Sequence, residues 1–162
     1  AIDTSVRSNF DYSAQDGPDY SAHPLVPYWV GPDRALLELP VTTVFWGMLR
    51  RQGPLIHRLA RSQPKVRGLL TRLSLLEKIA LTPEGVTLEE ALRGIDIAID
   101  DGLLVILLSF HSPSLAPGHT PYVRTEADLD LFYDWLRGVY AYLRQRGVAP
   151  TTVSAIMDAV QR

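Results

Sequence analysis

The sequence predicts an α/β domain in which short strands alternate with helices. Two observations support this: stripes of apolar residues at helical spacing follow helix-capping sequences, and short apolar runs without that spacing lie between them. The chain has 162 residues, of which 46% are hydrophobic and 21% are charged. Its length is sufficient for a single domain spanning residues 1–162, and its composition is typical of a folded protein.

Net charge and missing residue types argue against several classes of protein. The formal net charge of −2 does not favour nucleic-acid binding. A basic cluster between Met48 and Arg72 is interleaved with Leu and Ile at helical spacing, which favours a solvated helix face over a binding patch. There is no cysteine, so disulfides, thiolate zinc sites and cysteine nucleophiles are excluded. Because the aliphatic run at 103–108 is too short to cross a bilayer, we expect no membrane partner.

The first half of the chain combines predicted strands with one long irregular segment. Residues 7–34 are dense in Pro, Gly, Asp and aromatic residues, and so long a loop inside a compact domain is usually functional. Around it the pattern predicts, in order, a strand end at Ile2–Val6, a strand at Leu36–Val44 that is irregular at Pro40, helices at Gly53–Ser62 and Val66–Leu76, and a short strand at Lys78–Thr82.

A strand–helix–strand unit follows and is the clearest feature of the sequence. Thr87 and Glu90 have the spacing of a capping box, and the apolar stripe over 88–99 predicts the helix that it starts. A glycine ends this helix, and the six aliphatic residues 103–108 predict a strand buried on both faces, as in a parallel sheet. Together with the strand at 78–82 this is a βαβ unit, which requires a parallel pair.

A second capping sequence, Thr125–Asp128, predicts a long helix that ends at Gly147, and Thr151–Arg162 predicts a final short helix. The fold expected is therefore about four short parallel strands with flanking helices. Four strands are too few to close a barrel, which needs about eight, and an open sheet would need protected edges. We therefore expect the later half of a larger α/β barrel, completed by the N-terminal half of the same barrel or by a homo-oligomer partner.

His111 stands where the run 103–108 gives way to a loop rich in Pro and Gly. In parallel α/β folds, ligands bind at the carboxyl ends of the strands, and barrels carry their catalytic groups there. Imidazole titrates near neutrality, so that it can give a proton to a leaving group and recover it. The residues alone leave two interpretations open: a catalytic histidine, or a partly buried one hydrogen-bonded to the loop backbone.

Several segments resemble the polysaccharide deacetylases of the NodB-homology group, and among them the WalW-like branch. They are IDTSVRSNFDYSAQDGPDYSAHP, LLELPVTTVFWG, LTPEGVTLEEAL and LLVILLSFHSPSLAPGHTPYVRTEADLDLFYDWL. The resemblance covers nearly the whole chain, but only the C-terminal portion of that family's domain. It implies a distorted (β/α) barrel that removes N- or O-acetyl groups from a carbohydrate polymer.

The resemblance also implies a division of chemical roles. A divalent metal, most commonly zinc, is held by an aspartate and two histidines, and a nearby aspartate acts as general base. A late strand supplies the general acid, and the matching residue here is His111. The family's T-F-D-D-like and H-[ST]-x-x-H-like segments are absent from this chain. We therefore expect a metal in the full-length protein, none held by this chain alone, and no deacetylase activity from this fragment alone.

The long loop and the strands beside it offer candidates for substrate binding, because aromatic rings stack on sugars and carboxylates accept hydrogen bonds from hydroxyl groups. Packing within the loop is the alternative role for each loop residue, and solvation at a strand end is the alternative for Glu38. Asp3 is a further candidate whose alternative is a turn, and Glu84 is interpreted as part of a Thr-Pro-Glu-Gly turn. The candidate substrate-binding residues are Asp11, Tyr12, Asp19, Tyr20, Tyr28, Trp29 and Glu38.

The remaining histidines and serines give weaker signals. His119 lies eight residues beyond His111, a spacing that matches no common metal-ligand motif. His57 is interpreted as a surface residue of the basic helix, and His23 is a loop residue with no evident partner. Ser112 and Ser114 lack the G-x-S-x-G pattern of a serine hydrolase. The alternative to an enzyme is a non-catalytic carbohydrate-binding or assembly module that kept the scaffold and lost the metal motifs.

Overall fold

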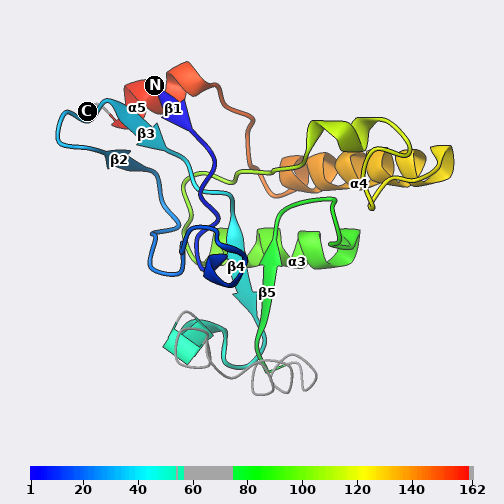
Figure 1. Ribbon diagram of the computed structural model, residues 1–162, viewed down its shortest axis with the longest axis horizontal. Helices are drawn as coiled ribbons and strands as arrows, with labels where there is room; N and C mark the ends of the chain where they lie inside the picture. Colours follow the sequence, from blue (N-terminus) through cyan, green and yellow to red (C-terminus); the bar gives the residue numbers. More distant parts are fainter. Residues whose placement is uncertain (54, 57–74, 161–162) are drawn as a thin grey trace.

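The computed structural model describes residues 1–53, 55–56 and 75–160 (Figure 1). Within these ranges the chain is a mixture of short strands and helices, as the sequence predicts. The α-helices are α3 (Leu88–Asp100), α4 (Glu126–Gln145) and α5 (Val153–Val160), and the short 3₁₀ helices are η1 (Ser13–Gln15), η2 (Arg50–Gln52) and η3 (Ser112–Leu115). The strands are β1 (Ile2–Asp3), β2 (Tyr28–Val30), β3 (Leu36–Glu38), β4 (Thr43–Trp46) and β5 (Glu77–Ala80).

The described strands form two small sheets rather than the expected set of about four parallel strands. One sheet has the order β1-β3-β2, in which β1 is parallel to β3 and β2 is antiparallel to it. The other pairs β4 with β5 in antiparallel register, with Thr43 opposite Ala80 and Trp46 opposite Glu77. The strand predicted at 78–82 therefore pairs antiparallel with β4, and the predicted βαβ unit, with its parallel partner at 103–108, is wrong. The apolar pattern indicates which residues are buried, but the relative direction of two strands depends on the path of the chain that connects them.

The aliphatic segment 103–108 is not a strand of either sheet. Two backbone hydrogen bonds hold the end of this segment. Thr42 N–H donates to the Leu107 carbonyl at 3.2 Å, and Ser109 N–H donates to the Leu81 carbonyl at 3.1 Å. The prediction of burial on both faces is also wrong, since Leu104 is 92% exposed. The other five aliphatic residues of this run are half-buried, so none of the six lies in a core closed on both faces.

Helix α3 takes part in two buried clusters, and Figure 1 shows it crossing the β4–β5 sheet. Thr87 and Glu90 form the predicted capping box at its N-terminus. One buried cluster joins α3 to the β4–β5 sheet through Val44, Ile79, Ile97 and Ala98. A second joins it to α4 through Leu81, Ala91, Ile95, Trp135 and Val139. Trp135, expected in the core, is 6% exposed.

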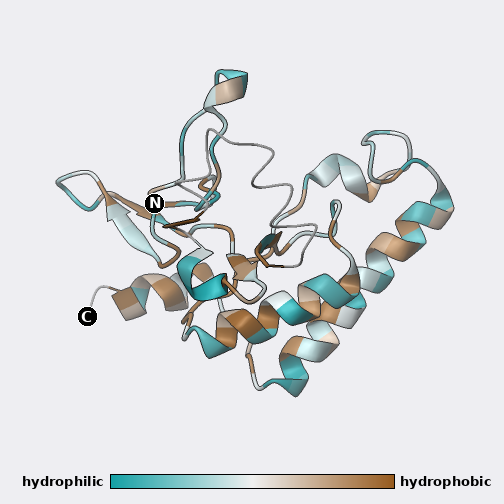
Figure 2. Ribbon diagram, turned by 90° about the horizontal axis from the view of Figure 1, so that it is seen from below, coloured by the Kyte–Doolittle hydropathy of each residue, from teal (hydrophilic) through white to brown (hydrophobic). Residues whose placement is uncertain are grey.

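Helix α4 begins at the second predicted capping box, formed by Thr125 and Asp128. Hydrophobic and hydrophilic residues alternate along α3 and α4, as in amphipathic helices packed on one face (Figure 2). Polar contacts also hold the two helices together, because the Tyr142 hydroxyl donates to the Asp96 carboxylate at 2.8 Å and Arg146 forms an ion pair with the same carboxylate at 2.5 Å. Helix α5 lies on the side of the molecule that carries β1, β2 and β3.

Other predictions have mixed outcomes. The segment 7–34 is mainly irregular, as expected, but contains η1 and β2. The helices predicted at 53–62 and 66–76, the basic cluster and His57 lie wholly or largely outside the described residues. No helix in the described part of the chain has the length and apolar character needed to span a membrane.

Candidate active site

The His111 ring makes a short hydrogen bond to a carboxylate. His111 follows the segment 103–110 and is the N-cap residue of η3. Glu84 lies in the turn after β5, and the Ser109–Leu81 backbone hydrogen bond places the two segments side by side. His111 Nδ1 and Glu84 Oε2 are 2.6 Å apart.

Glu84 is a buried carboxylate that accepts three hydrogen bonds. Besides the ring Nδ1, the His111 backbone N–H donates to Glu84 Oε1 at 2.9 Å, and the Ser114 hydroxyl donates to the same oxygen at 2.6 Å. The Glu84 side chain is 3% exposed. Burial is the largest single influence and raises the pKa of Glu84, but these donors together outweigh it and hold the pKa below its ordinary value. The carboxylate is therefore ionised at neutral pH.

Because Glu84 is ionised, it determines which nitrogen of the His111 ring carries the shared proton and which nitrogen stays available to a substrate. A carboxylate only accepts hydrogen bonds, so Nδ1 carries the proton that lies between the two groups. Nε2 is then an acceptor in the neutral ring and a donor in the imidazolium. The His111 side chain is 70% exposed, so Nε2 is accessible to a substrate. This arrangement fixes the tautomer and orientation of the ring, as in catalytic triads where a buried carboxylate orients a histidine.

The two interpretations of His111 left open by the sequence are resolved in part by this geometry. The ring is exposed and bonds to a carboxylate, not to the loop backbone. The sequence pattern did not identify Glu84 as the partner of the His111 ring. It does lie in a turn, where its backbone N–H donates to Thr82 Oγ1 at 3.2 Å, but its carboxylate reaches the histidine. The signal available in the sequence was an acidic residue directly after one apolar segment and a histidine directly after the next.

The candidate residues of the long loop are engaged mostly with one another. Asp11 and Asp19 accept hydrogen bonds from backbone N–H groups two residues ahead, those of Ser13 and Ser21. These are local turns of the kind named as the alternative role. The aromatic candidates form a row in which Tyr12 contacts Tyr20, Tyr20 contacts His23, and His23 Nδ1 lies 2.7 Å from the Tyr28 hydroxyl.

Glu38, Asp3 and Tyr28 are brought together across the three-stranded sheet. Glu38 stands opposite Asp3 on one side and Tyr28 on the other. Glu38 is 2% exposed, and burial raises its pKa although the Val6 N–H donates to it. Hydrogen bonds from Ser5 and the Thr4 backbone lower the pKa of Asp3. Trp29, on β2, keeps its indole N–H buried without a partner, and Arg34 lies over its ring.

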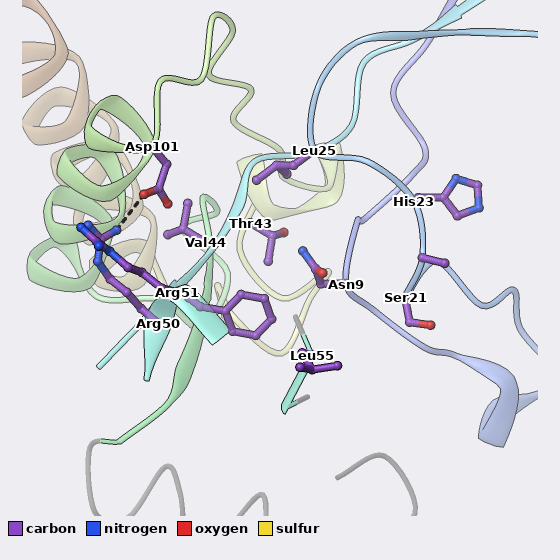
Figure 3. A pocket seen from close by; sticks show the side chains of 12 residues that line it. Asn9, Ser21, His23, Leu25, Thr43, Val44, Arg50, Arg51, Leu55 and Asp101 are labelled. Carbon is purple, nitrogen blue, oxygen red and sulfur yellow. Dashed lines mark hydrogen bonds and ion pairs between the residues drawn. The ribbon is translucent and has the colours of Figure 1, made fainter. Parts of the chain in front are cut away.

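A cavity of about 790 Å³ lies elsewhere, between the long loop and β4 (Figure 3). Its floor includes Phe45 and Val44, and Arg50 and Asp101 form an ion pair of 2.9 Å at its edge. Neither His111 nor Glu84 lines it. The candidate substrate-binding residues are also not among its described lining residues, so the cavity is separate from the chemistry described above.

The described residues do not fit a metal ion. No group of three or more His, Asp or Glu side chains within these ranges is placed to hold one. His111 Nδ1 is already occupied by Glu84, and His119 completes no metal-ligand group with it.

Comparison with known proteins adds no relatives: no protein-family model, no curated protein and no solved structure matches this chain.

Proposed function

We propose that this chain supplies the proton-donating wall of a hydrolase that removes acetyl groups from a carbohydrate polymer, with His111 as the general acid. The observation that carries the proposal is the exposed His111 ring held at 2.6 Å by the buried carboxylate of Glu84. The sequence segments that resemble the polysaccharide deacetylases supply the reaction class. In this proposal the chain is the later part of a distorted (β/α) barrel completed by further polypeptide.

The proton transfer assigned to His111 is simple. Water loses a proton to the general base that the resemblance places outside this chain and adds to the acetyl carbonyl carbon. As the carbon–nitrogen or carbon–oxygen bond to the sugar then breaks, the leaving amine or alkoxide takes the proton from Nε2 of the imidazolium, acetate is released, and the ring regains a proton from solvent. The neutral ring keeps its proton on Nδ1, hydrogen-bonded to Glu84, so the orientation of the ring is unchanged for the next cycle. The described residues do not fit the divalent metal that the resemblance implies.

A second candidate function is a non-catalytic carbohydrate-binding module. The observation in its favour is the row of aromatic rings in the long loop, from Phe10 and Tyr12 to Tyr20 and His23. These rings contact one another, which reduces the faces free to stack on sugars. The arrangement therefore supports this candidate less strongly than the His111–Glu84 pair supports catalysis.

The test uses the complete polypeptide that carries this chain. Release of acetate from acetylated oligosaccharides is measured for the unaltered protein and for His111→Ala and Glu84→Gln. We expect kcat to fall by roughly 10²- to 10⁴-fold for His111→Ala, and by roughly 10- to 100-fold for Glu84→Gln, because the ring loses its orienting partner. Bound metal content should stay the same.

His119→Ala is the matched control, because His119 is an exposed histidine of the same loop. It should keep full turnover. Unchanged turnover in His111→Ala would remove His111 from the reaction. Binding of the oligosaccharide by an unaltered protein that releases no acetate would favour the carbohydrate-binding module instead.

A further inference from the structure

We infer that Ser114 and Thr120 are positioning residues that act on His111 through Glu84, by way of a chain of hydroxyl groups. This inference rests on the proposed function, in which His111 transfers the proton. Neither hydroxyl contacts the His111 ring in the described structure, and both belong to the loop that follows it. The turn containing Glu84 and this loop are therefore tied together by side chains as well as by backbone.

Ser114 is the first link of this chain. It is fully buried, and its hydroxyl lies 2.6 Å from Glu84 Oε1. Its backbone N–H donates to the His111 carbonyl at 2.9 Å, which forms the first turn of η3. One short turn of backbone thus presents both a ring nitrogen and a hydroxyl to the two oxygens of one carboxylate. The carboxylate plane is fixed from both sides.

Proton counting gives the direction of the next link. The Ser114 and Thr120 hydroxyl oxygens lie 3.1 Å apart. Ser114 has a single hydroxyl proton, and an ionised carboxylate has none to offer, so that proton belongs to the bond with Glu84. Thr120 must then donate its own proton to Ser114. The Thr120 oxygen in turn accepts from the Val123 backbone N–H at 3.3 Å.

All the donors therefore point the same way, from Val123 through Thr120 and Ser114 to Glu84. Hydrogen bonds aligned in this manner strengthen one another, most of all where water is excluded. The negative charge of Glu84 is stabilised on the Oε1 side, which leaves Oε2 directed at the ring. Loss of the Ser114 hydroxyl leaves the His111 backbone N–H as the donor to Oε1 among the described contacts, so the carboxylate is held less firmly and the ring is less well oriented although its direct partner is still present.

The experiment compares Ser114→Ala, Thr120→Val and Thr120→Ser in the complete polypeptide. Thr120→Val keeps the shape and removes the hydroxyl, whereas Thr120→Ser keeps the hydroxyl. Ser112→Ala is the matched control, because Ser112 is an exposed serine of the same short helix. The first readout is the ¹⁵N and ¹H NMR signal of the His111 ring, in which a short Nδ1–H bond to a carboxylate gives a strongly downfield proton.

We expect Ser114→Ala and Thr120→Val to shift the Nδ1 proton upfield and broaden it. We expect kcat to fall by roughly 10-fold with little change in KM. Thr120→Ser and Ser112→Ala should keep both the ring signal and the turnover. An unchanged ring signal in both Ser114→Ala and Thr120→Val overturns the inference. If the ring signal shifts as expected in a protein that releases no acetate, the positioning role stands and the proposed function fails.

Discussion

At the scale of single residues, two buried glutamates show how the number of donors decides the state of a carboxylate. Glu84 accepts hydrogen bonds from the His111 ring, the His111 backbone and Ser114, and its pKa is lowered. Glu38 accepts from the Val6 backbone and lies beside Asp3, and burial raises its pKa. The two side chains are comparably hidden from solvent, so the partners rather than burial alone set the direction of the pKa change.

Glu84→Gln should change how stability depends on pH. A carboxyl group with a lowered folded pKa contributes stability that is complete above its ordinary value of 4.5 and is lost as pH falls below that value. The glutamine side chain also brings its own N–H donors against the N–H and O–H donors that surround Glu84. We expect unfolding in urea at neutral pH to show a loss of about 2 kcal/mol, with a smaller further loss on acidification than in the unaltered protein.

Glu38→Gln is the comparison for that measurement. Because the folded pKa of Glu38 is raised, its ionisation weakens the folded state as pH rises from below its ordinary value of 4.5 through the raised value. The variant should therefore lose stability less steeply than the unaltered protein as pH rises over that range. Parallel pH profiles for both variants and the unaltered protein would contradict the opposite roles assigned to these two groups.

At the scale of elements, the helix starts are set by nearby side chains. Thr87 and Thr125 each accept a hydrogen bond from the backbone N–H three residues ahead, and the acidic side chain at that position accepts one from the threonine backbone N–H. These contacts close within four residues and need no other part of the fold. The two capping boxes could therefore be found from sequence spacing alone.

Thr87→Ala should lower the free energy of unfolding by about 1 kcal/mol, because the backbone N–H of Glu90 loses its acceptor. Thermal or urea unfolding measures the change. Thr87→Ser keeps the hydroxyl and serves as the control, with stability close to that of the unaltered protein. Equal losses for both variants would mean that the threonine methyl group, and not the cap, carries the contribution.

At the scale of the whole molecule, α3 is packed between the β4–β5 sheet and α4, and a glycine permits the close approach to the sheet. A Cβ atom at Gly94 would lie 3.2 Å from both Ile79 Cγ2 and Leu81 Cδ2. Leu81 belongs to the buried cluster that also contains residues of α4. Glu84 follows Leu81 by three residues, in the turn after β5, so this packing helps to place the candidate site.

Gly94→Val should destabilise the protein by about 2 kcal/mol, since the branched side chain must push the helix away from the sheet. Asp100→Val is the control for helix propensity, because Asp100 is exposed at the end of the same helix. Urea unfolding should show a much smaller loss for the control. If the two variants lose equal stability, close packing at Gly94 is not the cause.

The sequence by itself determined the features that depend on neighbours along the chain. These are the two capped helices, their apolar faces and the buried Trp135. Helix caps and amphipathic faces close over a few residues, so their spacing is visible in one dimension.

Tertiary structure alone decided the direction of β5, the incomplete burial of segment 103–108, and the meeting of Glu84 with His111. Each of these depends on which segments, tens of residues apart, pack against one another. The apolar pattern of the sequence does not specify that choice. Glu84 and His111 are 27 residues apart, and only the packing of their two segments brings the carboxylate to the ring.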